Sequence, residues 1–441
     1  MDVRRALAAA AVLMLVGWPP LAGAVPPPVI DPGALPPDGP PGPTAPLVQT
    51  GTCVQTGVLP APEPQTVSAA QAFMNPQALW PGTGLGAGVT VAVIDTGVFP
   101  SARLRHLRGG GDYQVAGGDG LQDCDAHGTI VASIIGGTPA PTDAFVGMAP
   151  AADIVSIRES SAAYSLRDPL SREATRNLAL DTMARAVVHA ANTGAGVINI
   201  SLGTCIPAGE PADFAALGAA LRYAAVDKDA VIVAAAGNVD KRCPQNPDID
   251  TVDRADPRNW RGVVTVDSPA VFSDYVLSVT ATDNTYQPAT FLDGTELSLR
   301  GPWVGVAAPG VWVQGFNGQG ELVNATVNPD TGELGTISGT SFAAAYISGL
   351  AALMRAKFPD LTAAGVIQKI ESTAHGQLGA VNNRMGHGVV DPLAAMAGAS
   401  TTADGPSQAP PARTSRHKEV GMLVVGAIIA AGLVIARARK K

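Results

Sequence analysis

The sequence predicts an α/β domain built on a mainly parallel β-sheet. Short apolar runs rich in Val, Ile, Leu and Ala recur through the middle of the chain, as is typical of strands buried on both faces of a parallel sheet. Segments with helical patterning separate these runs, and parallel sheets are built by this alternation of strand and helix. Hydrophobic residues make up 46% of the 441 residues and charged residues 15%, which is enough apolar material for a sizeable core.

The expected elements follow from these patterns in chain order. The predicted strands are Val89–Ile94, Ile154–Ile157, Gly196–Leu202, Ala230–Ala236, Val276–Thr280 and Gly305–Ala308. Helical patterns include His127–Ile135, Leu178–Asn192, Ala212–Lys228 and Ala344–Phe358, and a short helix is expected around Val67–Trp80. We expect one domain over residues 88–397, and no internal repeat is evident.

The composition indicates which partners are unsuited to this domain and how regular its flanking segments are. The formal net charge of −8 argues against a nucleic-acid partner, because phosphate binding depends on clustered Lys and Arg. The chain holds 50 glycines and 37 prolines, and the prolines concentrate near the ends. This distribution predicts a folded centre with less regular flanks.

The N-terminus has the pattern of an export signal. Two arginines open the chain, an apolar stretch follows, and the small-x-small sequence Ala22-Gly23-Ala24 closes it. These features predict a secretory signal peptide over residues 1–24, with a buried helix or an uncleaved anchor as the alternative. Residues 25–87 then form an N-terminal extension, which is Pro-rich over Val25–Pro46 and contains Cys53.

The C-terminus has the pattern of a membrane anchor. Residues 398–419 are rich in Ser, Thr, Pro and Ala and predict a flexible linker. Residues 420–436 carry no charge, and the length of this segment is near the lower limit for crossing about 30 Å of hydrocarbon. The basic tail 437–441 should stay cytoplasmic. We therefore expect a single-pass cell-membrane protein whose folded domain lies outside the cytoplasm. A core helix of the folded domain is the alternative.

The number of cysteines also fits a domain that lies outside the cytoplasm. Cys53, Cys124, Cys205 and Cys243 are even in number, as expected of an exported chain in an oxidising setting. They allow three pairings, and their spacing does not choose among them.

Two candidate catalytic side chains lie in the first part of the domain. Asp95 directly follows the strand Val89–Ile94, and functional groups in open α/β sheets gather at the carboxyl ends of strands. His127 begins the helical pattern His127–Ile135, which follows that strand in the chain. A carboxylate that accepts a hydrogen bond from one imidazole nitrogen fixes the tautomer and leaves the other nitrogen free as a base. Taken singly, Asp95 could be a turn or ribose-binding residue and His127 a structural one.

A candidate nucleophile lies near the end of the domain. Ser341 immediately precedes the helical segment Ala344–Phe358, where a serine is most often only an N-cap. Gly339 permits a sharp approach, however, and the first free amides of the helix would point at a developing oxyanion. Ser338 and Thr340 are rival hydroxyls, and motif position favours Ser341.

The remaining polar candidates are an amide and scattered histidines. Asn238 ends a predicted strand after Gly237, which is an ordinary turn signal, but its side-chain amide could supply a second oxyanion donor. The other histidines have no zinc-site spacing, so we expect them to be structural or exposed: His106, His189, His375 and His387. No Asp-rich loop has convincing ligand spacing for calcium.

In order along the chain, several segments resemble the signatures of subtilisin-type serine proteases, the peptidase S8 family. They are Ala92–Gly97, His127–Thr129, Gly147–Pro150, Val197–Gly203, Ala236–Asn238, Ala307–Gly310 and Gly339–Ala343. The resemblance covers nearly all of residues 88–397. It implies a three-layer α/β/α fold, a catalytic triad of Asp95, His127 and Ser341, and Asn238 in the oxyanion hole. It also implies that Ser201, Leu202 and Gly203 pair with an extended peptide substrate, and that Ala235, Ala236 and Gly237 form the opposite wall of the main specificity pocket. No cofactor or metal is required, although some subtilases bind structural calcium.

A narrower resemblance is to the mycosins, membrane-anchored subtilases associated with type VII secretion in mycobacteria and related actinobacteria. The signal peptide, the Pro-rich segment with Cys53, the insertion Val239–Tyr275 and the terminal span carry it. It implies subunits of a secretion membrane complex as partners and the disulfides Cys53–Cys124 and Cys205–Cys243. Because the extension is short and Pro-rich, we expect it to wrap the domain and stay attached rather than to form a folded inhibitory prodomain.

Two rival hypotheses remain. Asp95-Thr96-Gly97 recurs as Asp330-Thr331-Gly332, and two such triplets mark pepsin-like aspartic proteases. The second triplet lies in a polar turn, however, and the helical segments contradict an all-β enzyme. The stronger rival is a structural or docking subunit of a secretion complex that keeps a protease fold, with proteolysis secondary.

Overall fold

The fold is seen in a computed structural model that describes residues 27–60, 66–249, 256–328, 331–376 and 381–398. Seven parallel strands form its central sheet, in the order β12-β11-β9-β7-β3-β5-β4. Their bounds are β3 Thr90–Asp95, β4 Leu107–Asp112, β5 Asp153–Arg158, β7 Val197–Ile200, β9 Val231–Ala235, β11 Val276–Thr282 and β12 Val304–Pro309. The central sheet is thus wholly parallel, which is stricter than the mainly parallel sheet that the sequence predicts.

Helices cover both faces of this sheet and give a three-layer α/β/α arrangement. Alternate residues of β3 enter different cores: Val91 and Val93 pack on the side of α4 and α7, whereas Ala92 and Ile94 pack on the side of α5 and α6. The bounds of these helices are α4 His127–Gly136, α5 Arg172–Asn192, α6 Ala215–Arg222 and α7 Thr340–Lys357. Since both faces are buried, the strands need apolar residues at every position, which explains their continuous apolar runs.

The smaller elements lie around these layers. Short helices are α2 Ala69–Met74, α3 Pro76–Leu79, α8 Ala363–Thr373 and α9 Pro392–Met396, with the single turns η1 Pro32–Ala34, η2 Gly84–Gly86 and η4 Trp260–Gly262. Short strands form four further sheets: β1 Leu47–Gln49 with β6 Tyr164–Leu166, β8 Thr204–Pro207 with β10 Thr265–Ser268, β13 Gly315–Phe316 with β14 Leu322–Val323, and β2 Thr56–Gly57 with β15 Ala325–Val327 and β16 Leu334–Thr336.

Three of the differences between the observed and the predicted elements concern the central sheet and the helices that cover it. Strand β4 was not predicted, because it contains three consecutive glycines instead of an apolar run. Helix α5 begins at Arg172, before the predicted Leu178, because Ser171 caps it by accepting a hydrogen bond from Ala174 N. The pattern over residues 212–228 becomes helix α6 followed by the π-helical turn η3 Tyr223–Asp227.

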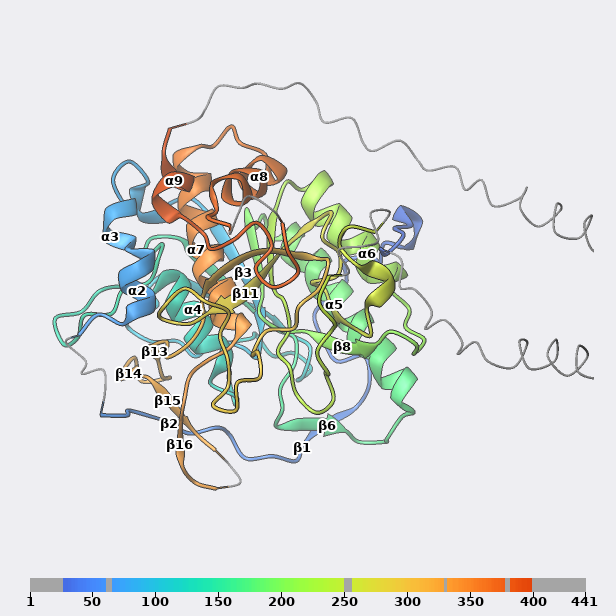
Figure 1. The fold of residues 1–441 in the computed structure, drawn as a ribbon. Helices are drawn as coiled ribbons and strands as arrows, with labels where there is room; N and C mark the ends of the chain where they lie inside the picture. The colour runs from blue at the N-terminus through green and yellow to red at the C-terminus, as the bar shows by residue number, and fades with distance from the viewer. Residues whose placement is uncertain (1–26, 61–65, 250–255, 329–330, 377–380, 399–441) are drawn as a thin grey trace, which may run out of the picture. The chain divides into compact units, whose positions relative to one another are not determined.

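The N-terminal extension lies along the domain. The carboxylate of Asp38 accepts hydrogen bonds from His189 and Asn192 at the end of α5. Strand β1 then pairs with β6. Further on, Val54 N donates to Cys124 O and strand β2 pairs with β15 (Figure 1). The extension therefore contacts segments of the domain that are far apart in the sequence.

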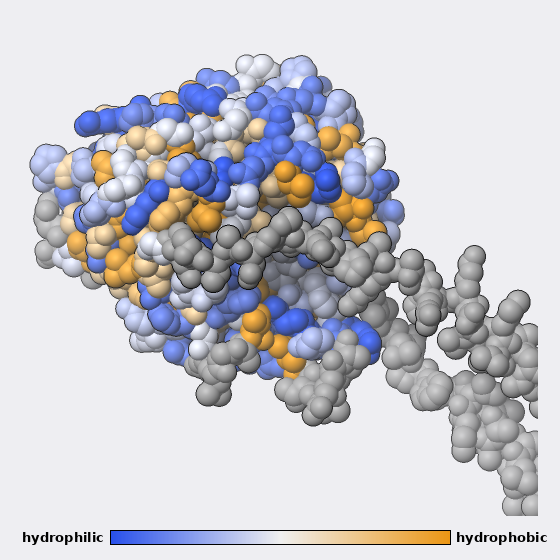
Figure 2. Space-filling model, turned by 90° about the horizontal axis from the view of Figure 1, so that it is seen from above, coloured by the Kyte–Doolittle hydropathy of each residue, from blue (hydrophilic) through white to orange (hydrophobic). Residues whose placement is uncertain are grey.

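Several predicted segments fall outside the described residues: the signal peptide, most of the linker, the membrane span and the basic tail. Within the described ranges no helix combines the length and hydrophobicity needed to cross a membrane. The surface seen from above in Figure 2 mixes hydrophilic residues with small separate groups of hydrophobic ones.

Candidate active site

The acid and the base of the predicted triad are joined by a hydrogen bond. Asp95 is the last residue of β3 and is fully buried, and His127 is the first residue of α4. His127 Nδ1 lies 2.7 Å from Asp95 Oδ1, and Thr96 N donates to the same oxygen at 2.7 Å. The imidazole is partly exposed, with 27% of its side-chain surface accessible. The geometry leaves Nε2 as the ring nitrogen that can accept a proton.

A second buried carboxylate, that of Asp123, binds the residues next to Asp95 and His127. Asp123 accepts hydrogen bonds from Thr129 N at 2.8 Å, from Thr129 Oγ1 and from Thr96 Oγ1, and Thr96 Oγ1 in turn accepts from Gly128 N. Asp123 therefore holds the first turn of α4 against the end of β3. Burial raises its pKa to about 6, despite the hydrogen bonds from the two threonines, which lower it.

The electrostatics of His127 are set by burial and by nearby acids. Burial alone would lower the pKa of His127, but the charge of Asp95 and the hydrogen bond to it raise the pKa, and the charges of Asp123 and Asp125 add to this. The net pKa lies above its ordinary value of 6.5. The imidazolium formed during proton transfer would thus be stabilised.

The candidate nucleophile lies at the start of α7. Ser341 is the second residue of that helix and is 6% exposed. Its Oγ donates to Ser201 O at 2.9 Å, and Ser201 Oγ donates to Ser341 O at 2.9 Å, so the two serines lock β7 to the helix start. Both Ser341 and His127 line one cavity, but in the described part of the chain no hydrogen bond joins them. A side-chain rotation of Ser341 toward the imidazole is needed before proton transfer.

The rival hydroxyls next to Ser341 already have partners. Thr340 Oγ1 donates to Asn238 Oδ1 at 3.1 Å and is fully buried, and Ser338 Oγ accepts from Trp312 N at 3.2 Å. Thr340 N also donates to Asn238 Oδ1 at 3.1 Å. Because the amide oxygen of Asn238 is committed to Thr340, its amide nitrogen is the group available to an oxyanion.

These residues share a cleft that the N-terminal extension helps to build. The cavity has a volume of about 580 Å³ and is lined by His127, Asn238 and Ser341 together with Phe342 and Val54 of the extension. The imidazole ring lies 5.3 Å from the ring of Phe342, centroid to centroid. The extension thus forms part of the cleft wall, while His127, Asn238 and Ser341 still line open space.

A second cavity lies on the other side of Ser341, where the sequence predicts the specificity pocket. Of the predicted substrate-binding residues, Ser201, Gly203, Ala235 and Gly237 line it, along with Asn238. Leu202 and Gly203 line a neighbouring cavity of about 440 Å³. Ala236 differs from this expectation, because it is fully buried and belongs to the core between the sheet and α5.

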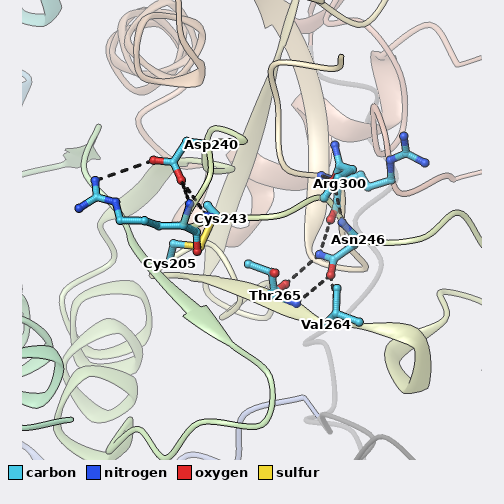
Figure 3. The surroundings of a disulfide bond; sticks show 9 residues. Cys205, Asp240, Cys243, Asn246, Val264, Thr265 and Arg300 are labelled. Carbon is cyan, nitrogen blue, oxygen red and sulfur yellow. Dashed lines mark hydrogen bonds and ion pairs between the residues drawn. A yellow bond between two sulfur atoms is a disulfide. The ribbon is translucent and has the colours of Figure 1, made fainter. Parts of the chain in front are cut away.

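Two disulfides border the site, with the pairing that the mycosin resemblance implies. Cys53–Cys124 joins the extension to the segment just before His127. Cys205–Cys243 joins the segments that follow β7 and β9, as Figure 3 shows. In the same view Asp240 accepts from Cys243 N, and Asn246 bridges to Thr265 and Arg300, so a hydrogen-bond network fixes the loop beside the second cavity.

The remaining histidines and acids form pairs rather than clusters. In the part of the chain that the structure describes, each histidine outside the site lies within 4 Å of one carboxylate: His106 of Asp153, His189 of Asp38, His375 of Asp391 and His387 of Glu371. Among the described residues, no group of three or more His, Cys, Asp or Glu side chains could hold a metal ion.

Sequence reasoning missed two carboxyl groups near the site. Asp123 lies four residues before His127, outside the N-cap position that Ala126 occupies, so no helix-start pattern marked it. Asp267 lines the second cavity from β10, inside a long insertion with no recognisable motif. Only the folded chain brings Asp267 beside Gly203 and Gly237.

Comparison with known proteins identifies the family of the chain. Residues 86–388 match the model of the subtilase family, Peptidase_S8. Mycosin-3 of Mycobacterium tuberculosis is 43% identical over an alignment that covers 100% of this chain and 99% of the relative.

Solved structures of similar proteins have the same fold. The crystal structure of MycP1 from the ESX-1 type VII secretion system superposes with a TM-score of 0.81 at 44% identity, covering 88% of this chain and 99% of that one. A chain in the periplasmic assembly of the ESX-5 inner membrane complex gives a TM-score of 0.81 at 48% identity, covering 88% and 97%.

Proposed function

The chain belongs to the subtilase family and within it to the mycosins, and from this premise we propose that it is a serine endopeptidase of the cell envelope that hydrolyses peptide bonds of secreted proteins. The observation that carries the proposal is the 2.7 Å hydrogen bond between Asp95 and His127 beside a cleft that Ser341 also lines. We propose that these three residues are its catalytic triad.

The reaction is acyl transfer. His127 Nε2 takes the Ser341 proton as Oγ attacks the scissile carbonyl carbon, and Asp95 orients the ring and stabilises the imidazolium. The tetrahedral intermediate collapses to an acyl-enzyme as the protonated His127 gives its proton to the leaving amine. Water, activated by the same base, then attacks the ester, and Ser341 recovers its proton. None of these steps needs a metal or cofactor.

The oxyanion is held by two groups at the start of α7. Asn238 Nδ2 is one donor, because Thr340 orients the amide by bonding to its oxygen. A backbone amide near Ser341 is the other, since the first amides of a helix have no partner within the helix. We expect the substrate to lie as an extended strand along Ser201–Gly203.

The N-terminal extension is proposed to stay attached without inhibiting the enzyme. Cys53–Cys124 ties it to the segment before His127, and β2 pairs with β15 beyond the cleft. The cleft between these attachments remains open to a substrate.

The setting is proposed from the termini and the relatives. A signal peptide, a C-terminal span and a cytoplasmic basic tail would place the domain outside the cytoplasm, anchored in the cell membrane. Relatives of similar length occur in the ESX-5 inner membrane complex. We propose that subunits of a type VII secretion membrane complex are partners of this chain as well.

The test uses the full-length chain purified in detergent. A fluorophosphonate probe should label Ser341, and labelling should disappear in Ser341→Ala but persist in the neighbouring control Ser338→Ala. Asp95→Asn should lower turnover by about 10⁴-fold, because the carboxylate that fixes the histidine tautomer is lost. Absence of any label on the wild-type chain would remove the basis of the protease assignment.

A structural role in the secretion complex is the second candidate, favoured by the similarity to a chain of an assembled membrane complex. Ser341→Ala separates the two roles in cells. If secretion persists while peptide cleavage stops, the scaffold role is independent of the chemistry.

A further inference from the structure

A buried acid that no step of the mechanism uses lies beside the nucleophile. Asp267 belongs to β10, where it pairs with Cys205 of β8. The residue is 3% exposed, and it lines the same cavity as Ser341. Its Oδ1 is buried and has no hydrogen-bond partner. A buried polar atom without a partner is costly to the fold, so its position calls for an explanation.

The carboxyl group occupies the space between the two walls of the cavity. A methyl group on Gly203 would overlap Asp267 Oδ1, and a methyl group on Gly237 would lie 2.9 Å from Asp267 Cγ. Gly203 follows β7 and Gly237 follows β9, so these glycines stand on opposite sides of the expected substrate side chain. The carboxyl group therefore takes up room that a large side chain would need.

The charge state of this acid changes with pH near neutrality. Burial raises the pKa of Asp267 to about 7, with no cation offsetting it. The cation on the cavity lining is Arg242, whose side chain is 93% exposed and lies 3.8 Å from the carboxylate of Asp240. Asp240 in turn accepts hydrogen bonds from Arg242 N and Cys243 N (Figure 3). The inner end of the cavity thus carries an acid that is about half protonated near pH 7 rather than a permanently ionised one.

We propose that Asp267 is a specificity-determining residue that closes the inner end of the pocket and limits the substrate residue before the scissile bond to a small side chain. Alanine, serine and glycine have the required size. The inference rests on the proposed protease function and specifies the substrate class of that same site.

The experiment compares full-length wild type, Asp267→Gly and Asp267→Asn on peptides that differ only in the residue before the scissile bond. Wild type should cleave the Ala and Ser peptides best and the Leu and Phe peptides poorly. Asp267→Gly should raise kcat/KM for the Leu and Phe peptides relative to the Ala peptide by at least about tenfold. A pocket that accommodates even one more methylene group changes the ratio of kcat/KM values between two substrates by about 10–200-fold. Asp267→Asn matches the acid in size and should keep the wild-type order.

Fluorophosphonate labelling of Ser341 separates the possible failures. If wild type is not labelled, the proposed function fails before specificity is tested. If wild type is labelled but prefers Lys or Arg, and Asp267→Asn abolishes that preference, the carboxylate receives a cation and the inference is overturned. An unchanged order of peptides in a labelled Asp267→Gly chain also overturns it. Asp267→Ala gives the same readout should the glycine variant fail to fold.

Discussion

Replacement of Asp267 by Asn should stabilise the fold at neutral and alkaline pH. The pKa of this acid moves from 3.8 to about 7 on folding, so the folded state holds a proton that the unfolded state has released. Stability of the wild type therefore falls as pH rises from about 4 to about 7 and is flat above that. About three pH units at ~1.4 kcal/mol each give roughly 4 kcal/mol at pH 8, as an order of magnitude. Asn lacks this titration, so the variant escapes the loss.

The assay is urea unfolding at pH 5 and pH 8, in a Ser341→Ala background that prevents autolysis. The difference in unfolding free energy between Asp267→Asn and its parent should grow in favour of the variant by about 3 kcal/mol between the two pH values. Other buried acids cancel, because both chains contain them. Asp274→Asn, an exposed acid in the same insertion, is the control and should give no pH-dependent difference. A difference for Asp267→Asn that does not change with pH would refute the reasoning.

Three further predictions follow from the site and its supports. Asn238→Ala should lower kcat by about 10²–10³-fold with little change in KM, as measured for an oxyanion donor in a subtilisin; a change confined to KM would contradict the role. Replacing Cys53 and Cys124 by Ser should lower the unfolding free energy by about 4 kcal/mol, the chain-entropy value for a separation of 71 residues, and urea unfolding at matched pH tests it. Asp123→Asn should move the acid limb of the kcat/KM profile to lower pH, because it removes a charge that raises the pKa of the catalytic histidine; an unmoved limb would mean that Asp123 acts only on structure.

Most of the sheet could be predicted because its strands are buried on both faces. Strand β3 is apolar over its four inner residues 91–94, and its end is marked by Asp95, so position and expected role are visible together. Strand β4 could not be found in this way, since its glycines pack against neighbouring backbone and side chains rather than contribute apolar surface. Its place in the sheet depends on tertiary contacts that a local pattern does not contain.

The site residues also differ in whether a local sequence pattern could reveal them. The fold places Asp95 beside His127, and Ser341 in their cleft, at the strand and helix ends where the sequence expects them. Asp267 was missed because its surroundings come from β7, β9 and an insertion, and its burial is a property of the packed chain. The sequence also could not reveal that Ser341 bonds to a carbonyl oxygen across the sheet end rather than to the imidazole.

The contacts of the N-terminal extension impose an order on assembly. Its strand β2 pairs with β15, and Leu59 N donates to Asn324 Oδ1, so the extension is completed by residues as far as 265 positions later in the chain. Until Asn324 arrives, the extension can be held only by its earlier contacts and by Cys53–Cys124. The cleft wall that contains Val54 therefore depends on a contact that joins residues 265 positions apart, and it is complete only once both segments have folded together.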